Sequence, residues 1–225
     1  MKISVIGSGN MGSGFVKLLS SAGHTVFITA RDKAKATEVA KAHGATVVDA
    51  KTAATAEVIV LATGYADAVN ALQLLGNLNG KVVIDITNPL TADYMGLTIG
   101  HSTSAAEEIA NAVPGIKLVK AFNTVFAQVL AGGAQLPSGE QVQVFVAADD
   151  AAAKKTVTNL VTQLGFKAID SGALKNARYL EAVAGFNIFL GYGAGLGTSI
   201  APSWSGLNPA PVVEVKRSWL QRLLG

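Results

Sequence analysis

The amino-acid sequence predicts an α/β protein with a doubly wound, mainly parallel sheet and a small C-terminal extension of helix and loops. Short β-branched runs alternate with segments whose apolar residues recur at helical spacing. Several of these runs are apolar throughout, as is typical of parallel strands buried on both faces. The chain also opens with a strand, a glycine turn and a helix. We therefore expect right-handed crossovers between successive parallel strands.

Composition and charge narrow the classes of function. The net charge is only +3 and the basic residues are spread along the chain, which argues against a nucleic-acid partner. The chain has no cysteine and its three histidines lie far apart in sequence, so we expect no metal site. The N-terminus enters a strand at once, without room for a signal peptide, and we expect a cytoplasmic protein.

One long stretch, residues 182–213, carries no charged residue. It is long enough to cross a bilayer, but Asn187, Pro202 and Trp204 interrupt it, so we expect no membrane span. The favoured interpretation is a buried wall that faces a pocket or a second subunit. Because so much apolar surface rarely stays exposed on a monomer, we expect a homodimer.

The chain is long enough for one large domain or for a domain with a small extension. We place a nucleotide-binding domain at 1–148 and a smaller part at 149–225 that closes a pocket and forms subunit contacts. Glycines at 23 and 44 are expected to end the first two helices, and Asp32 to cap the start of the second. Strands are expected at 25–30, 45–48, 58–62, 81–86, 117–122, 141–147 and 167–170, and helices at 11–21, 33–43, 66–75, 102–111, 149–164, 176–190 and 214–224.

The first turn carries the most informative motif, a Gly-x-Gly-x-x-Gly pattern between a strand and a helix. Its first glycine allows the tight turn, its second lets the backbone approach a pyrophosphate, and its third lets the helix pack on the strand. Free N–H groups at the helix start would hold the phosphates. This context predicts a Rossmann dinucleotide site rather than a merely structural turn. Its residues are Gly7, Ser8, Gly9, Asn10, Met11 and Gly12.

The tip of the second strand decides between the two nicotinamide cofactors. If Asp32 is the tip residue, its carboxylate binds a free ribose hydroxyl and the cofactor is NAD. If Ala30 is the tip residue, Arg31 and Lys35 meet a 2′-phosphate. The apolar run stops at residue 28 and Asp32 is already explained as a helix cap, so we favour NADP(H). The competing interpretation of Arg31 and Lys35 is a solvated helix start.

Polar and small residues also follow three other predicted strands. Ligands of an open parallel sheet bind outside the carboxyl ends of its strands. Each of these segments alone could be an ordinary turn, but together they are expected to form a floor for the ribose and the nicotinamide. The residues are Thr63, Gly64 and Tyr65, then Asn88 and Pro89, and finally Phe122, Asn123 and Thr124.

The glycine turn, the segment 23–26 leading to Arg31, the run 119–124 and the later run 170–174 resemble the family of NADPH-dependent 8-hydroxy-5-deazaflavin (coenzyme F-420) reductases. The similarity extends to about residue 201, and broader kin include ferric reductase domains that pass hydride from NADPH to flavin. It implies a Rossmann domain for NADP(H) and a small C-terminal part over a flat tricyclic partner. Ser8 to Met11 would line the pyrophosphate, Ala30, Arg31 and Lys35 the 2′-phosphate, and Thr63, Gly64, Asn88, Phe122 and Asn123 the nicotinamide side.

The favoured function is therefore hydride transfer between NADPH and a small-molecule acceptor, a deazaflavin, FMN or FAD. Such transfer needs stacked rings and no obligatory acid or base, so we assign no catalytic residue. His101 is the one residue considered as a proton donor, and an exposed loop position is favoured for it. Two alternatives stay open: an imine or small-carbonyl reductase, which would want a catalytic lysine or a long dimerising helical domain, and a sensor that binds NADP(H) without turnover.

Overall fold

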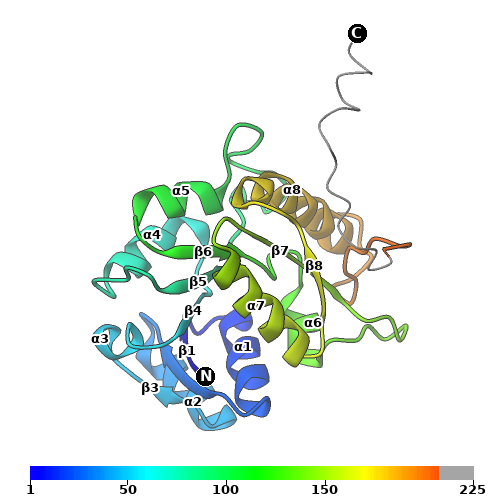
Figure 1. Ribbon diagram of the computed structural model, residues 1–225. Helices are drawn as coiled ribbons and strands as arrows, with labels where there is room; N and C mark the ends of the chain where they lie inside the picture. The colour runs from blue at the N-terminus through cyan, green and yellow to red at the C-terminus, as the bar shows by residue number, and fades with distance from the viewer. Residues whose placement is uncertain (208–225) are drawn as a thin grey trace.

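The computed structural model describes residues 1–207, in which eight strands form one sheet with the order β3-β2-β1-β4-β5-β6-β7-β8 (Figure 1). Strands β1 to β6 run parallel, β7 is antiparallel to β6, and β8 is parallel to β7. The predicted doubly wound, mainly parallel α/β fold is confirmed. The strands are β1 Lys2–Ile6, β2 Thr25–Thr29, β3 Thr46–Val47, β4 Val58–Leu61, β5 Val82–Asp85, β6 Lys117–Lys120, β7 Gln143–Ala148 and β8 Lys167–Asp170.

Helices cover both faces of this sheet. One apolar cluster joins the sheet to α1, α2, α6 and α7, and a second joins its other face to α3, α4 and α5. Successive side chains of a strand point to opposite faces of the sheet, so each buried strand contributes to both clusters. In β1, Ile3 and Val5 belong to the first cluster, whereas Ile6 belongs to the second. The helices are α1 Asn10–Ser21, α2 Lys33–His43, α3 Ala50–Ala53, α4 Tyr65–Gln73, α5 Ala105–Ala112, α6 Ala127–Gly132, α7 Ala151–Gln163 and α8 Ala177–Ile188.

Strand order explains where a ligand can bind. The chain adds β2 and β3 on one side of β1 and then crosses back to add β4 on its other side, so the strand order reverses at β1 and leaves a crevice at its carboxyl end. The carboxyl ends of β5 and β6 reach the same edge of the sheet, because all of these strands are parallel. The residues after β1, β2, β4, β5 and β6 therefore form one row along this edge.

Capping residues and helix-ending glycines predicted most helix and strand boundaries correctly. Asp32 caps α2 by accepting a hydrogen bond of 2.9 Å from the backbone N–H of Lys35, as expected, and Gly44 ends that helix with a φ of 73°. Helices α3 and α6 were not predicted, and α8 continues into a π-helical turn, Phe189–Gly193. The predicted helix at 214–224 lies outside the described residues. The division at residue 148 stays a prediction, and β8 pairs with β7 across it.

The uncharged stretch is buried on only one side of α8, and the contact expected between its other side and a second subunit stays a prediction. Helix α8 turns Leu180, Ala184 and Asn187 inward, where they are buried. The aromatic rings of Phe186 and Phe189 lie on the opposite side, 62% and 46% exposed, and stack on each other. No helix within residues 1–207 is long and apolar enough to cross a membrane.

Candidate functional site

The three glycines of the first turn occupy three different environments. Gly7 has a φ of 118°, and a Cβ there would meet the carbonyl oxygen of Ala62 at 2.4 Å. A Cβ on Gly12 would lie 2.1 Å from the carbonyl oxygen of Gly7, so only glycine lets α1 pack this closely. By contrast, a Cβ on Gly9 would meet no atom of residues 1–207 within 4 Å. The first and third glycines therefore build the turn, and the second leaves open space in front of it.

Helix α1 begins beside this space with its backbone donors free of side-chain caps. Gly9 is its N-cap residue and carries no side chain to accept from the first N–H groups. These donors and the helix dipole suit a pyrophosphate. Ser8 lines one cavity beside the turn and Met11 lines another, whereas Asn10 lines neither of them.

The cavity on the β2 side, here called the Arg31 cavity, has a volume of about 420 Å³. Gly7, Ser8 and Gly9 form its floor, and the segment after β2 and the segment after β4 form its walls. The hydroxyl oxygen of Thr63 is buried without a hydrogen-bond partner among the described residues, so this cavity holds an unused polar group. The lining includes Ala30, Arg31, Asp32, Thr63, Gly64 and Asp67, but neither Lys35 nor Tyr65.

Arg31 and Asp67 face each other across this cavity. The guanidinium of Arg31 donates two hydrogen bonds to the carboxylate of Asp67, at 3.2 and 2.8 Å. The Arg31 side chain is 84% exposed, so it is free to meet a ligand from solvent. Lys35 is exposed on the first turn of α2, where its backbone N–H donates to the carboxylate of Asp32. Arg31 is therefore the cation that the structure places on the cavity wall.

Tyr65 points to α5 instead of the cavity. Its hydroxyl donates a short hydrogen bond to the carboxylate of Glu108. Burial, together with this hydrogen bond, raises the pKa of Tyr65 to about 12. The phenol is therefore neutral at physiological pH and fastens α4 to α5.

The second cavity, here called the Asn88 cavity, has a volume of about 490 Å³ and lies beyond the carboxyl ends of β5 and β6. Asn88 donates to the carbonyl oxygen of Asn123 at 2.8 Å, and the Asn123 amide donates back to the Asn88 side-chain oxygen at 2.9 Å. This reciprocal pair joins the two strand ends. The lining is otherwise mostly apolar and includes Met11, Ile86, Leu90, Val125, Phe126 and Ile188.

Besides Tyr65, four residues expected at the ribose and nicotinamide do not line this cavity: Thr63 and Gly64 line the Arg31 cavity instead, and Phe122 and Pro89 line neither. Phe122 has a φ of 61°, which turns its ring into the core, where it packs edge-on against Phe15 and Phe166. It is fully buried, and its left-handed backbone places Asn123 at the cavity instead. Pro89 does not line the cavity, and its carbonyl oxygen accepts hydrogen bonds from Thr98.

A buried charged network below the Asn88 cavity was not predicted. The ammonium group of Lys120 lies 2.9 Å from the carboxylate of Asp85 and 2.8 Å from that of Glu181, and it donates to the carbonyl oxygen of Thr87 at 2.5 Å. All three charged side chains are at least 98% buried. The sequence contains a pattern that could have indicated this network. Asp85 and Lys120 interrupt otherwise apolar strands, and charged residues buried in such strands are usually paired.

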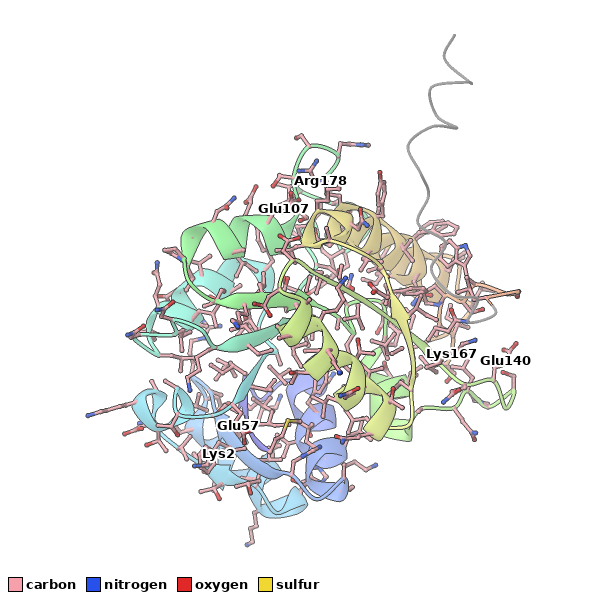
Figure 2. All side chains as sticks on the ribbon, in the orientation of Figure 1. Lys2, Glu57, Glu107, Glu140, Lys167 and Arg178 are labelled. Atoms are coloured by element: carbon pink, nitrogen blue, oxygen red, sulfur yellow. The ribbon has the colours of Figure 1, made fainter. Side chains whose placement is uncertain are left out.

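The same network fixes α5 and α8 to the strand ends. The Glu181 carboxylate accepts hydrogen bonds from the first backbone N–H groups of α5, at 2.8 and 3.1 Å. On the surface, Arg178 of α8 pairs with Glu107 of α5, as Figure 2 shows, and lowers the pKa of the Glu107 carboxyl. His101 is exposed, as favoured, and only its carbonyl oxygen contacts Arg178, at 3.4 Å.

Comparisons with known proteins agree with this geometry. The family model described as NADP oxidoreductase coenzyme F420-dependent matches residues 2–89. The chain is 28% identical over 182 residues to metalloreductase STEAP3 of Rattus norvegicus, which covers 81% of this chain but only 36% of that relative. The chain therefore spans about a third of that relative's length.

In two further comparisons, the alignment covers most of this chain and most of the similar protein. The chain is 31% identical over 204 residues to the F420-dependent NADP reductase of Methanothermobacter thermautotrophicus, covering 81% of this chain and 86% of the relative. A crystal structure of a provisionally assigned F420-dependent NADP reductase from Arthrobacter sp. FB24 superposes with a TM-score of 0.79 at 31% identity, over 90% of this chain and all of that one. The chain belongs to the F420-dependent NADP oxidoreductase family, whose members are NADP-dependent oxidoreductases.

Proposed function

We propose that the protein transfers hydride between NADPH and a flavin-like ring, either a deazaflavin or a flavin. The observation that carries this proposal is the pair of cavities on either side of the glycine turn. The Arg31 cavity offers a cation for the adenosine end of the cofactor. The Asn88 cavity offers apolar walls where the nicotinamide end would meet a second flat ring.

The residues present fit NADP(H). The open space at Gly9, the free donors of α1 and the unpartnered hydroxyl of Thr63 provide room and hydrogen bonds for the pyrophosphate and ribose. Arg31 would bind the 2′-phosphate. When bound, the nicotinamide supplies a hydride, two electrons with one proton, and the acceptor takes it up together with a proton from solvent.

The chain's own contribution is to bind, orient and exclude water. The Asn88–Asn123 pair fixes the strand ends beside the cavity, and Ile86 and Val125 provide apolar surface there. Lys120 is enclosed and fully paired, so it does not offer the free amine that an imine reductase would use. Hydride transfer between stacked rings needs no such group.

Stopped-flow absorbance of NADPH mixed with the protein and, in turn, the deazaflavin, riboflavin, FMN and FAD tests the proposal. We expect oxidation of NADPH with at least one of these acceptors. The variant Gly9→Ala is the matched inactive control, because its added methyl meets no atom in the described part of the chain but fills the open space before the turn. NADPH that binds without oxidation by any acceptor would instead support the sensor hypothesis.

A further inference from the structure

The wall that α8 forms beside the Asn88 cavity contains a buried amide, that of Asn187. The residue is only 6% exposed and lines the cavity. Its amide nitrogen donates a hydrogen bond to the backbone carbonyl oxygen of Thr124 at 3.2 Å. A carbonyl oxygen can only accept, so this bond fixes the orientation of the amide and turns its oxygen away from Thr124.

The oxygen of this amide has no hydrogen-bond donor within residues 1–207, where the Asn187 side chain makes only its bond to Thr124. The oxygen of Asn88, by contrast, accepts from Asn123. The oxygen of Asn123 is enclosed by protein atoms, whereas that of Asn187 is not. Asn187 therefore presents a free acceptor to a ligand in the cavity.

Apolar side chains share the cavity lining with this acceptor. They include Ile86 and Val125, which follow β5 and β6, and Ile188, which follows Asn187 on α8. A hydrogen bond made among them is shielded from water, whereas an acceptor covered by an apolar group stays unsatisfied at a cost in free energy. A ligand that fills the cavity should therefore bind more tightly if it brings a donor to Asn187.

We propose that Asn187 is a specificity-determining residue of the Asn88 cavity, and that its oxygen accepts a hydrogen bond from an amide or imide N–H of a ring bound there. The proposal rests on the proposed hydride transfer, which brings two rings with this chemistry. The nicotinamide carries a carboxamide, and a flavin or deazaflavin carries an imide. Flat hydride acceptors without such a donor, such as quinones, would leave the oxygen unpaired and bind more weakly.

Two pairs of ligands test the proposal on the full chain and distinguish the two rings. Riboflavin and 3-methylriboflavin differ in the imide hydrogen, and their binding to the protein saturated with NADP⁺ is measured by quenching of flavin fluorescence. NADP⁺ and its 3-acetylpyridine analogue differ in the amino group of the carboxamide, and titration calorimetry measures their binding. We expect the N–H ligand of one pair to bind about 5- to 10-fold more tightly, and that pair identifies the ring that Asn187 binds.

The variant Asn187→Ala removes the acceptor and leaves room for the methyl group, so the ratio within that pair should fall to about one. If Asn187 only held α8 to Thr124, the variant would weaken both ligands alike and keep the ratio. Ile188→Ala is the matched control, because it also shortens a cavity-lining side chain of α8 but keeps the Asn187 oxygen. It should retain the preference.

The absence of a preference within both pairs on the wild-type protein would overturn the proposal, and this comparison does not depend on the folding of any variant. Loss of the preference in Ile188→Ala would also overturn it, because the methyl group would then be excluded by lack of space. Turnover is a separate readout. A preference within one pair without NADPH oxidation by any acceptor supports the hydrogen bond and contradicts the proposed hydride transfer.

Discussion

Arg31 shows how a single exposed side chain carries the choice of cofactor. In the structure its guanidinium binds the carboxylate of Asp67, with one side chain 84% and the other 44% exposed. Exposed ion pairs of this kind contribute about 0–1 kcal/mol, whereas charge-assisted hydrogen bonds to a phosphate are about twice as strong as neutral ones. Arg31 can therefore leave Asp67 for a 2′-phosphate at little cost.

Replacing Arg31 with alanine should weaken NADPH binding far more than NADH binding. Loss of a charged hydrogen-bonding partner corresponds to about 1.5–3 kcal/mol, or roughly 10- to 100-fold in the NADPH dissociation constant. Titration calorimetry with both nucleotides measures this. Lys41→Ala, at the far end of α2, is the control for net charge. Equal losses for NADPH and NADH would contradict the phosphate assignment.

The variant Asp67→Asn should have the opposite effect. It removes a carboxylate that competes for Arg31 and repels the phosphate, so we expect NADPH to bind about threefold to fivefold more tightly. NADH, which lacks the phosphate, should bind as before. The same calorimetric titration measures both constants. A weaker affinity for NADPH would mean that Asp67 orients Arg31 toward the phosphate.

At the scale of elements, the buried network joins the ends of β5, α5 and β6 to α8, which lies far along the chain. Lys120 ends β6, Asp85 ends β5, and Glu181 of α8 binds the first N–H groups of α5. Each carboxylate oxygen of Asp85 and Glu181 has a polar partner, and the Lys120 ammonium has three oxygen partners, which makes such burial tolerable. The network thereby sets how α8 sits beside the Asn88 cavity.

Removing one partner from this network should destabilise the protein strongly. For Glu181→Ala we expect a loss of about 3–5 kcal/mol in the free energy of unfolding, because Lys120 stays buried with one carboxylate less and the α5 donors lose their acceptor. Urea denaturation followed by circular dichroism measures this. Glu107→Ala, which breaks the part-exposed pair with Arg178 and the hydrogen bond from the Ser104 hydroxyl, should cost less, about 1–2 kcal/mol. Comparable losses for the two variants would argue against the network as the main link.

At the scale of the whole molecule, the uncharged face of α8 is exposed. Phe186, Phe189, Tyr192 and Leu196 gather on it and on the turn that follows. Monomers rarely expose large contiguous apolar surface. The homodimer expected from the composition remains a prediction, and this face is where we expect its contact.

Light scattering after size exclusion should give twice the chain mass of 23.0 kDa. The double variant Phe186→Ser with Phe189→Ser should shift the protein toward the monomer, since it removes two stacked rings from the surface. Leu74→Ser changes another exposed apolar residue, at the end of α4, and should leave the mass unchanged. A monomeric wild-type protein would remove the basis for this assignment.

The sequence by itself determined what local physics controls. Gly7, Gly12 and Gly44 occupy backbone positions or close contacts that exclude larger residues, and Asp32 caps a helix through its own neighbours. These features, with the apolar periodicity, predicted the order of strands and helices and the dinucleotide turn. The cofactor class followed from the residues at the tip of β2 and is that of the family.

Tertiary structure alone decided what depends on residues far apart in the chain. The antiparallel direction of β7 and the inward turn of Phe122 follow from packing against distant strands and rings. Likewise, Arg31 meets Asp67 and Lys120 meets Glu181 only after folding brings them together. The exposure of one side of α8 could not be predicted for the same reason. The hydrophobicity of a segment does not show which of its faces another element covers.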